Sequence, residues 1–203
     1  TDVQAVCDSL VYSSKDSCLS LYTDPILWQG PQQLLGEEIK VYMNDSTIDW
    51  AHIINQALAV EMNDSIHYNQ VTGKEMKAFF RNGEMHQVDV DGNVLCIYYP
   101  VEEGDTTLMM MDYTESSHLR MVLKDRKLER GAFIGHTTGV VYPMDQIPAD
   151  RLRLDAFAWF DYVRPRSKED IFEWRGKGAD AVLRKSDRKP IGSARDLNIK
   201  RKK

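Results

Sequence analysis

The sequence predicts an all-β fold in which repeated hairpin rungs form a twisted, open β-jelly-roll. Three observations predict it. The first two are an internal repeat along the chain and apolar residues that alternate with polar ones inside each repeat. The third observation is a tight-turn signal after each alternating run, which is typical of hairpins. A hairpin with one apolar face cannot bury that face alone, so we expect the units to stack into one continuous β layer.

The repeat becomes visible when three segments of the chain are aligned without gaps. Residues 36–60 align with residues 73–97, and residues 116–140 form a third copy. The dipeptide Tyr99-Pro100 recurs after the third copy as Tyr142-Pro143. Because the copies share their apolar positions, each is expected to adopt the same local structure.

Each copy has the pattern of a strand, a turn and a second strand. The turns are predicted at Asn44-Asp45-Ser46, Asn82-Gly83 and Lys124-Asp125-Arg126. Asn82-Gly83 is the strongest turn signal, because both residues accept the positive φ of a two-residue hairpin. After each turn an apolar residue is followed by a step of three, as from Met85 to Val88, before alternation resumes. A step of three changes the face of the strand, so we expect a bulge or corner in every copy.

The two ends of the chain depart from the repeat. Residues 7–22 are predicted to form a leading hairpin, as an imperfect fourth unit. After Pro143 the alternation stops, and Ser167 is a candidate N-cap for one short helix. We therefore divide the chain into a β-jelly-roll over residues 1–145 and an irregular, basic extension with short helices over residues 146–203.

Composition excludes several classes of protein. The 203 residues are about one domain's worth of chain, 42% hydrophobic, and no apolar run approaches the roughly twenty residues of a membrane-spanning helix. Residues 1–150 hold 10 Lys and Arg against 23 Asp and Glu, whereas residues 151–203 hold 16 against 8. An acidic body argues against nucleic-acid binding. The chain does not start with Met or a signal-peptide pattern, so we expect a mature or trimmed segment.

No pattern of side chains predicts catalysis, a metal site or a cofactor. The nucleophile-elbow, phosphate-loop, dinucleotide and zinc-protease motifs are all absent from the sequence, and the five histidines have no ligand spacing. Residues 89–93 look superficially like a calcium loop, but the later ligand positions do not fit, which favours a turn or bulge. Cys7, Cys18 and Cys96 are too few for a disulfide scaffold, and hairpin geometry disfavours a Cys7–Cys18 bridge.

The ordered succession of units carries a resemblance to a known family. Together with Asp145-Gln146-Ile147-Pro148-Ala149-Asp150 and Arg164-Pro165-Arg166-Ser167-Lys168-Glu169-Asp170-Ile171-Phe172, it resembles the OstA-like proteins of Bacteroidetes. These belong to the wider organic-solvent-tolerance, LptA-like family of lipopolysaccharide-transport proteins. The resemblance covers about residues 7–172, and the basic region after residue 150 is a departure from a minimal family module.

The resemblance implies a non-enzymatic periplasmic protein with a slit-like β-jelly-roll that carries lipopolysaccharide toward the outer membrane. The implied partners are lipid A acyl chains, and other Lpt-type modules or a second copy joined by edge-strand addition. The alternative is an envelope assembly adaptor that oligomerises through strand edges and binds no lipid. On the transport interpretation, the inward apolar positions line the slit: Ile39, Val41, Met43, Ile53, Met76, Ala78, Phe80, Val88, Val90, Leu119, Met121, Leu123 and Phe133.

Overall fold

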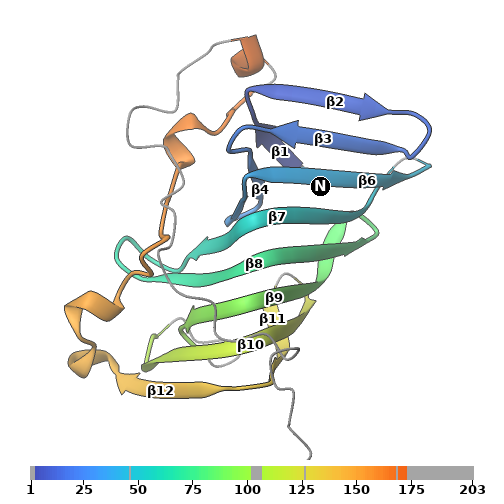
Figure 1. The fold of residues 1–203 in the computed structure, drawn as a ribbon. Helices are drawn as coiled ribbons and strands as arrows, with labels where there is room; N and C mark the ends of the chain where they lie inside the picture. The colour runs from blue at the N-terminus through green and yellow to red at the C-terminus, as the bar shows by residue number, and fades with distance from the viewer. Residues whose placement is uncertain (1–2, 46, 102–106, 126, 168, 173–203) are drawn as a thin grey trace, which may run out of the picture.

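The computed structural model describes residues 3–45, 47–101, 107–125, 127–167 and 169–172. Within these ranges every regular element before residue 144 is a β-strand, which confirms the predicted all-β class (Figure 1). The strands are β1 (Val3–Val6), β2 (Ser9–Ser13), β3 (Cys18–Tyr22), β4 (Ile26–Gln29), β5 (Gln32–Leu35), β6 (Glu38–Asn44), β7 (Thr47–Met62), β8 (Tyr68–Arg81), β9 (Glu84–Tyr98), β10 (Met110–Lys124), β11 (Lys127–Ile134) and β12 (Thr138–Pro143). Four short 3-10 turns follow: η1 (Met144–Gln146), η2 (Ala149–Arg151), η3 (Asp161–Val163) and η4 (Glu169–Phe172).

The four long strands β7 to β10 pass through two layers of one antiparallel sheet. The first half of β7 pairs with β6 and its second half pairs with β5. In the same way β10 pairs with β12 through its first half and with β11 through its second half. The first layer therefore runs β2-β3-β6-β7-β8-β9-β10-β11, and the second runs β1-β4-β5-β7-β8-β9-β10-β12. Among the described strands, the sheet does not close on itself.

The strands change layer at corners that recur in the repeat. The pairing register shifts between Ile54 and Ala57 on β7, and again between β9 and β10. Asn55, Gly92 and Gly135, which the repeat places in equivalent positions, have φ values of 55°, 81° and 97°. Positive φ at each copy turns the chain sharply, so the turn or bulge predicted at residues 89–93 is a corner that recurs in each copy.

The hairpin turns also follow the sequence pattern. Asn82 and Gly83 form a two-residue turn with φ values of 53° and 77°, which closes the β8–β9 hairpin. A bulge lies at the predicted step after this turn, because Phe79 pairs with Gln87 and Phe80 pairs with Met85. The β6–β7 and β10–β11 hairpins have the same register shift.

The principal core lies between the two layers. Ile39 and Val90 reach it from the first layer, and Leu27 and Val71 reach it from the second. Two smaller cores lie on the other face of the second layer, where Trp28 and other buried residues pack under the chain that follows β12. We call residues 144–166 the strap; in Figure 1 it runs from β12 past the middle strands toward the N-terminal strands.

Buried glutamines hold the strap by its backbone. The Gln33 side chain accepts a hydrogen bond from Phe160 N–H at 2.8 Å and donates one to the Ala158 carbonyl at 2.9 Å. Gln70 repeats this arrangement six residues earlier on the strap, accepting from Leu154 N–H at 2.9 Å. Both glutamines are fully buried, so each amide replaces the water that strap backbone groups lose on docking.

A short helical turn, η4, lies at the end of the described chain, close to Ser167, the predicted N-cap. The backbone N–H groups of Arg166 and Ser167 donate to the Asp170 carboxylate at 2.6 and 3.3 Å, just before η4. Most of the basic extension, from residue 173 onward, lies outside the described residues. The division of the chain at residue 145 therefore stays a prediction.

Candidate functional site

An apolar cavity of about 120 Å³ lies between the two layers, at the β9–β11 side of the sheet. Alternate side chains of each layer point inward, so both layers contribute side chains to its wall. The first layer contributes Met85, Val88, Leu119, Met121, Leu123, Leu128, Gly131 and Phe133, and the second contributes Leu34, Ala59, Val71 and Cys96.

Of the residues predicted to line a slit, five are found on the wall of this cavity. Seven others lie in the closed part of the core and are at most 5% exposed. The closure comes from β1, β4 and β5, which bring Val3, Leu27 and Leu34 against the first layer. Lining the cavity are Val88, Leu119, Met121, Leu123 and Phe133. In the closed core are Ile39, Val41, Ile53, Met76, Ala78, Phe80 and Val90.

The closed part ends at a contact between two hairpin tips. Gln29, at the end of β4, donates a hydrogen bond of 2.9 Å to the carbonyl of Gly83 in the β8–β9 turn. This contact links the second layer to the first. Met43, the remaining predicted lining residue, is 38% exposed and lies outside the core cluster. It lies at the tip of the β6–β7 hairpin, where it pairs with Ile48.

Polar side chains border the cavity on the second layer. We call the row formed by Gln32, Glu61, Asn69, Tyr98 and Asp112 the polar rim. These residues follow one another across β5, β7, β8, β9 and β10, as the pairings Gln32–Glu61, Glu61–Asn69 and Tyr98–Asp112 show. The sequence analysis missed the rim because its members are far apart in the chain and align only in the folded register.

Hydrogen bonds within the second layer orient the rim carboxylates. Asn69 donates to the Glu61 carboxylate at 3.1 Å, and the Thr114 hydroxyl donates to Asp112 at 2.7 Å. Burial raises the pKa of the Tyr98 phenol, and the negative charge of Glu61 raises it further. The rim therefore presents two acidic side chains and a phenol with a raised pKa beside an apolar wall.

The three cysteines form no disulfide. Cys7, Cys18 and Cys96 keep their thiols, and Cys18 lies opposite Ser13 in the β2–β3 hairpin. Cys96 is on the cavity wall, where burial raises the pKa of its thiol to about 12. A thiol in this environment stays protonated and behaves as a small apolar side chain.

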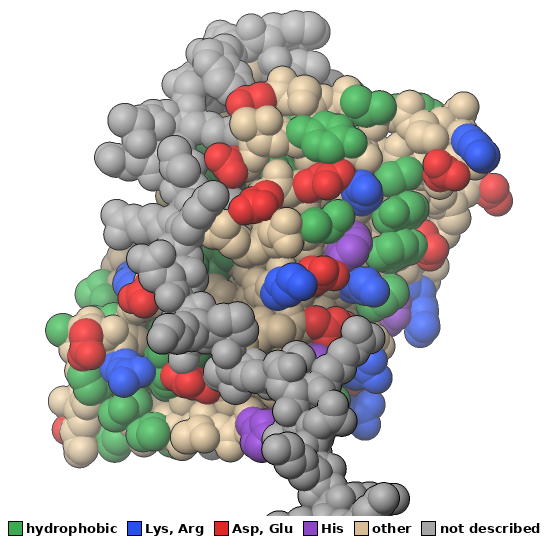
Figure 2. Space-filling view, in the orientation of Figure 1, with side chains coloured by type: hydrophobic (Ala, Val, Ile, Leu, Met, Phe, Trp, Pro, Cys, Tyr) green, Lys and Arg blue, Asp and Glu red, His purple; other side chains and the backbone are tan. Residues whose placement is uncertain are grey.

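The outer face of the first layer carries charges of both signs, and Figure 2 shows them interspersed with hydrophobic side chains. The Asp89 carboxylate pairs with Arg120 at 2.8 Å, and Asp91 contacts His118 at 2.6 Å. Both aspartates lie on β9, next to the corner at Gly92, so the segment that looked like a calcium loop is strand and corner. Among the described residues, no group of His, Cys, Asp and Glu has the arrangement of a metal site.

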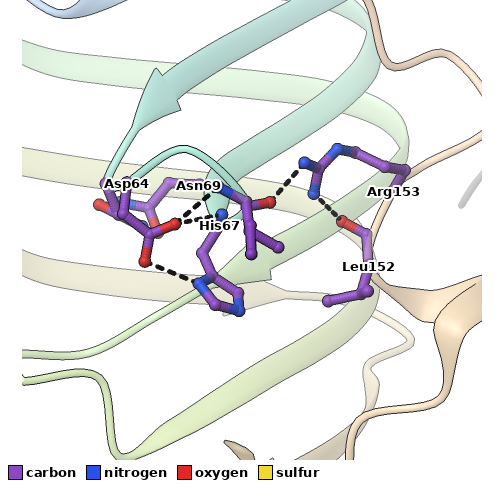
Figure 3. Close-up of polar contacts among 7 residues, drawn as sticks. Asp64, His67, Asn69, Leu152 and Arg153 are labelled. Atoms are coloured by element: carbon purple, nitrogen blue, oxygen red, sulfur yellow. Dashed lines mark hydrogen bonds and ion pairs between the residues drawn. The ribbon is translucent and has the colours of Figure 1, made fainter.

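The loop between β7 and β8 lies beside the rim and is fixed from two sides (Figure 3). The Asp64 carboxylate accepts hydrogen bonds from Ile66 N–H and His67 N–H at 2.7 Å, and contacts the His67 ring at 2.8 Å. Arg153 of the strap donates to the Ile66 carbonyl, and its guanidinium lies 4.6 Å from the centre of the Tyr68 ring. The strap therefore holds the loop that leads into the rim residue Asn69.

Comparison with known proteins shows a likeness in fold. No family model and no curated protein sequence matches the chain. Among solved structures, the fold is similar to that of LptH from Pseudomonas aeruginosa, described as the LptA-homologous periplasmic component of the conserved lipopolysaccharide transport device. The TM-score is 0.52 at 12% identity, over 70% of this chain and 96% of LptH. The chain has an LptA-like fold. The predicted open β-jelly-roll is thereby confirmed, and within the described residues no helix is long and apolar enough to cross a membrane.

Proposed function

We propose that the chain is a non-enzymatic periplasmic module that binds lipopolysaccharide acyl chains between its two layers and helps to carry them toward the outer membrane. The observation that carries this proposal is the apolar cavity inside an LptA-like fold. Each buried methylene contributes about 0.8 kcal/mol, so one fourteen-carbon chain in water costs on the order of 10 kcal/mol. An apolar channel removes that cost without any chemical step.

The size of the cavity limits what it holds in this conformation. Its volume of about 120 Å³ is close to that of an engineered cavity of about 150 Å³ that accepts benzene. It therefore accommodates one short stretch of an acyl chain. A longer stretch requires the layers to separate where Gln29 contacts Gly83, and separation would add Phe80 and Val90 to the lining.

The free strands at the two ends of the sheet support the proposed assembly with other modules. Among the described strands, β1, β2, β11 and β12 each pair with a single neighbour. Each layer thus ends in an unpaired edge on both sides. Leu10 and Val11 on β2, Ile134 on β11 and Val141 on β12 are more than half exposed. Exposed apolar edges are docking surfaces for strand addition by another Lpt-type module or by a second copy.

Photocrosslinking tests the lipid contact directly. A photoreactive residue in place of Met121, on the cavity wall, is expected to crosslink to lipopolysaccharide. The same residue in place of Lys77, which points away from the cavity between the inward residues Met76 and Ala78, is the matched control. Equal labelling at the two positions contradicts the proposal.

A blocking substitution gives an independent test. A Cβ atom built on Gly131 meets nothing within 4 Å, and this glycine lines the cavity. Gly131→Leu is therefore expected to extend into the cavity and to weaken lipid binding at least tenfold. Ala132→Leu, one residue along β11 and on the opposite face, is expected to leave binding unchanged. Equal lipid affinity of the two variants contradicts the cavity as the site.

An assembly adaptor is the second candidate function, and the closed core favours it. Seven of the predicted lining residues are sealed between the layers, which leaves only the sheet edges for interaction along that part of the molecule. This function predicts concentration-dependent growth of oligomers with no lipid bound. Size-exclusion chromatography with and without lipid separates the two functions, because only a transport module retains lipid in the eluted protein.

A further inference from the structure

The polar rim divides the cavity wall of the second layer into an apolar zone and a polar zone. Counting from Ala57, Gly73 and Val94, where strand pairing resumes beyond the corners, Ala59, Val71 and Cys96 come two residues out on β7, β8 and β9. The rim residues Glu61 and Asn69 come four residues out, which is about 13 Å along a strand. An amphiphile with its tail toward the corner would therefore present its head group at the rim.

The chemistry of the rim selects among head groups. Among the described residues that line the cavity, none is Lys or Arg, whereas Glu61 and Asp112 are both carboxylates. A phosphate placed there would meet two negative charges and no positive one. In a partly desolvated site, both carboxylates would repel the negatively charged phosphate.

Hydroxyl groups suit the same residues. Carboxylates accept hydrogen bonds, the amides of Gln32 and Asn69 donate and accept, and the Tyr98 phenol does both. Glu61 and Asp112 are already oriented by neighbouring donors, so little order is lost when a ligand binds. We infer that the polar rim is a subsite for a hydroxyl-bearing, saccharide-type head group of an amphiphile, and that it disfavours a bare phosphate. This inference rests on the proposed function, because it needs the tail in the cavity.

The test compares ligands that share one dodecyl tail. Dodecyl maltoside, dodecyl phosphate and dodecylammonium, each below its micelle concentration, are used to displace the fluorescent probe N-phenyl-1-naphthylamine from the full chain. The maltoside is expected to bind at least tenfold more tightly than the phosphate. The double variant Glu61→Gln, Asp112→Asn keeps the shape of the rim and removes its charge, so the phosphate is expected to gain about tenfold and the gap to close to within threefold.

A second double variant controls for net charge. Glu75→Gln, Asp91→Asn removes the same two charges from the outer face, where these carboxylates contact His52 and His118. This variant is expected to keep the tenfold preference for the maltoside. Probe binding itself reports that each variant retains a folded cavity.

Each contrary result has a distinct meaning. Equal binding of maltoside and phosphate to the unmodified chain overturns the head-group inference and leaves lipid binding intact. A tenfold preference for dodecylammonium over the maltoside overturns it as well, because the rim then selects positive charge. An equal effect of the outer-face double variant assigns the preference to net charge and also overturns it. Failure of the probe and of all three amphiphiles to bind overturns the proposed function, and the inference with it.

Discussion

Replacing Gln33 by Met should detach the middle of the strap at a cost of about 3 kcal/mol. The Gln33 amide makes two buried hydrogen bonds, with Phe160 N–H and with the Trp28 indole N–H at 3.3 Å, and one partly buried bond with the Ala158 carbonyl. Methionine has a similar volume but cannot replace these bonds. Three buried or partly buried polar groups then lose their partner, at a minimum of about 1 kcal/mol each. A loss of this size is a large fraction of the roughly 5–15 kcal/mol that stabilises a typical domain.

Urea denaturation and amide hydrogen exchange measure this prediction together. The denaturation midpoint should fall for Gln33→Met, and exchange at Phe160 N–H should accelerate more than exchange at buried amides of β8. Gln87→Met is the matched control, because the Gln87 side chain donates only to the partly buried Asp89 carboxylate. This substitution should change the free energy of unfolding by less than about 0.5 kcal/mol. A loss below about 1 kcal/mol for Gln33→Met, or unchanged exchange at Phe160, would refute the role assigned to the glutamine.

Three further predictions concern the loop beside the rim, a corner and the cavity wall. Hydrogen bonds from His67 lower the pKa of Asp64 to about 2, below its unfolded value, so the stabilisation is present above about pH 4 and is lost as pH falls toward 2. NMR titration of the His67 amide should follow this loss, and Asp64→Asn should abolish the titration. Gly73→Ala should destabilise the fold by about 1–3 kcal/mol in thermal unfolding, because the new Cβ would lie 2.5 Å from the Val90 side chain. With a pKa of about 12, Cys96 should react with iodoacetamide at pH 8 about a thousandfold more slowly than an ordinary thiol, as peptide mass mapping would show.

The repeated hairpins could be predicted from sequence because their determinants are local. Asn82-Gly83 specifies its turn through the positive φ of both residues, and the step from Met85 to Val88 marks a bulge. The corner at Gly92 was likewise visible, since the repeat places a turn-forming residue there in each copy. In all these cases the residues that determine the geometry are neighbours in the chain.

The strap and the closed half of the core could not be predicted, because their determinants are distant in sequence. Gln33 bonds to backbone groups of residues 158 and 160. Because backbone groups are the same in almost every residue type, the sequence of the strap does not reveal that Gln33 binds it. Alternation correctly placed Ile39 and Val90 on the inward face, yet it contains no information about the strand that covers that face. Here β4 and β5 provide the cover, and both lie outside the repeat.

The polar rim marks a change of residue type along the inward face of the strands. Near a corner, where the layers join, only apolar side chains can be buried without partners. At the border of the cavity, the carboxylates of Glu61 and Asp112 are tolerated on the inward face because they are partly exposed and hydrogen-bonded. The two-residue period continues from the apolar zone into the polar zone, and only the residue type changes. A guest molecule with one apolar and one polar end would be oriented by this change of residue type. Its apolar end would lie in the apolar zone, and its polar end would lie at the rim.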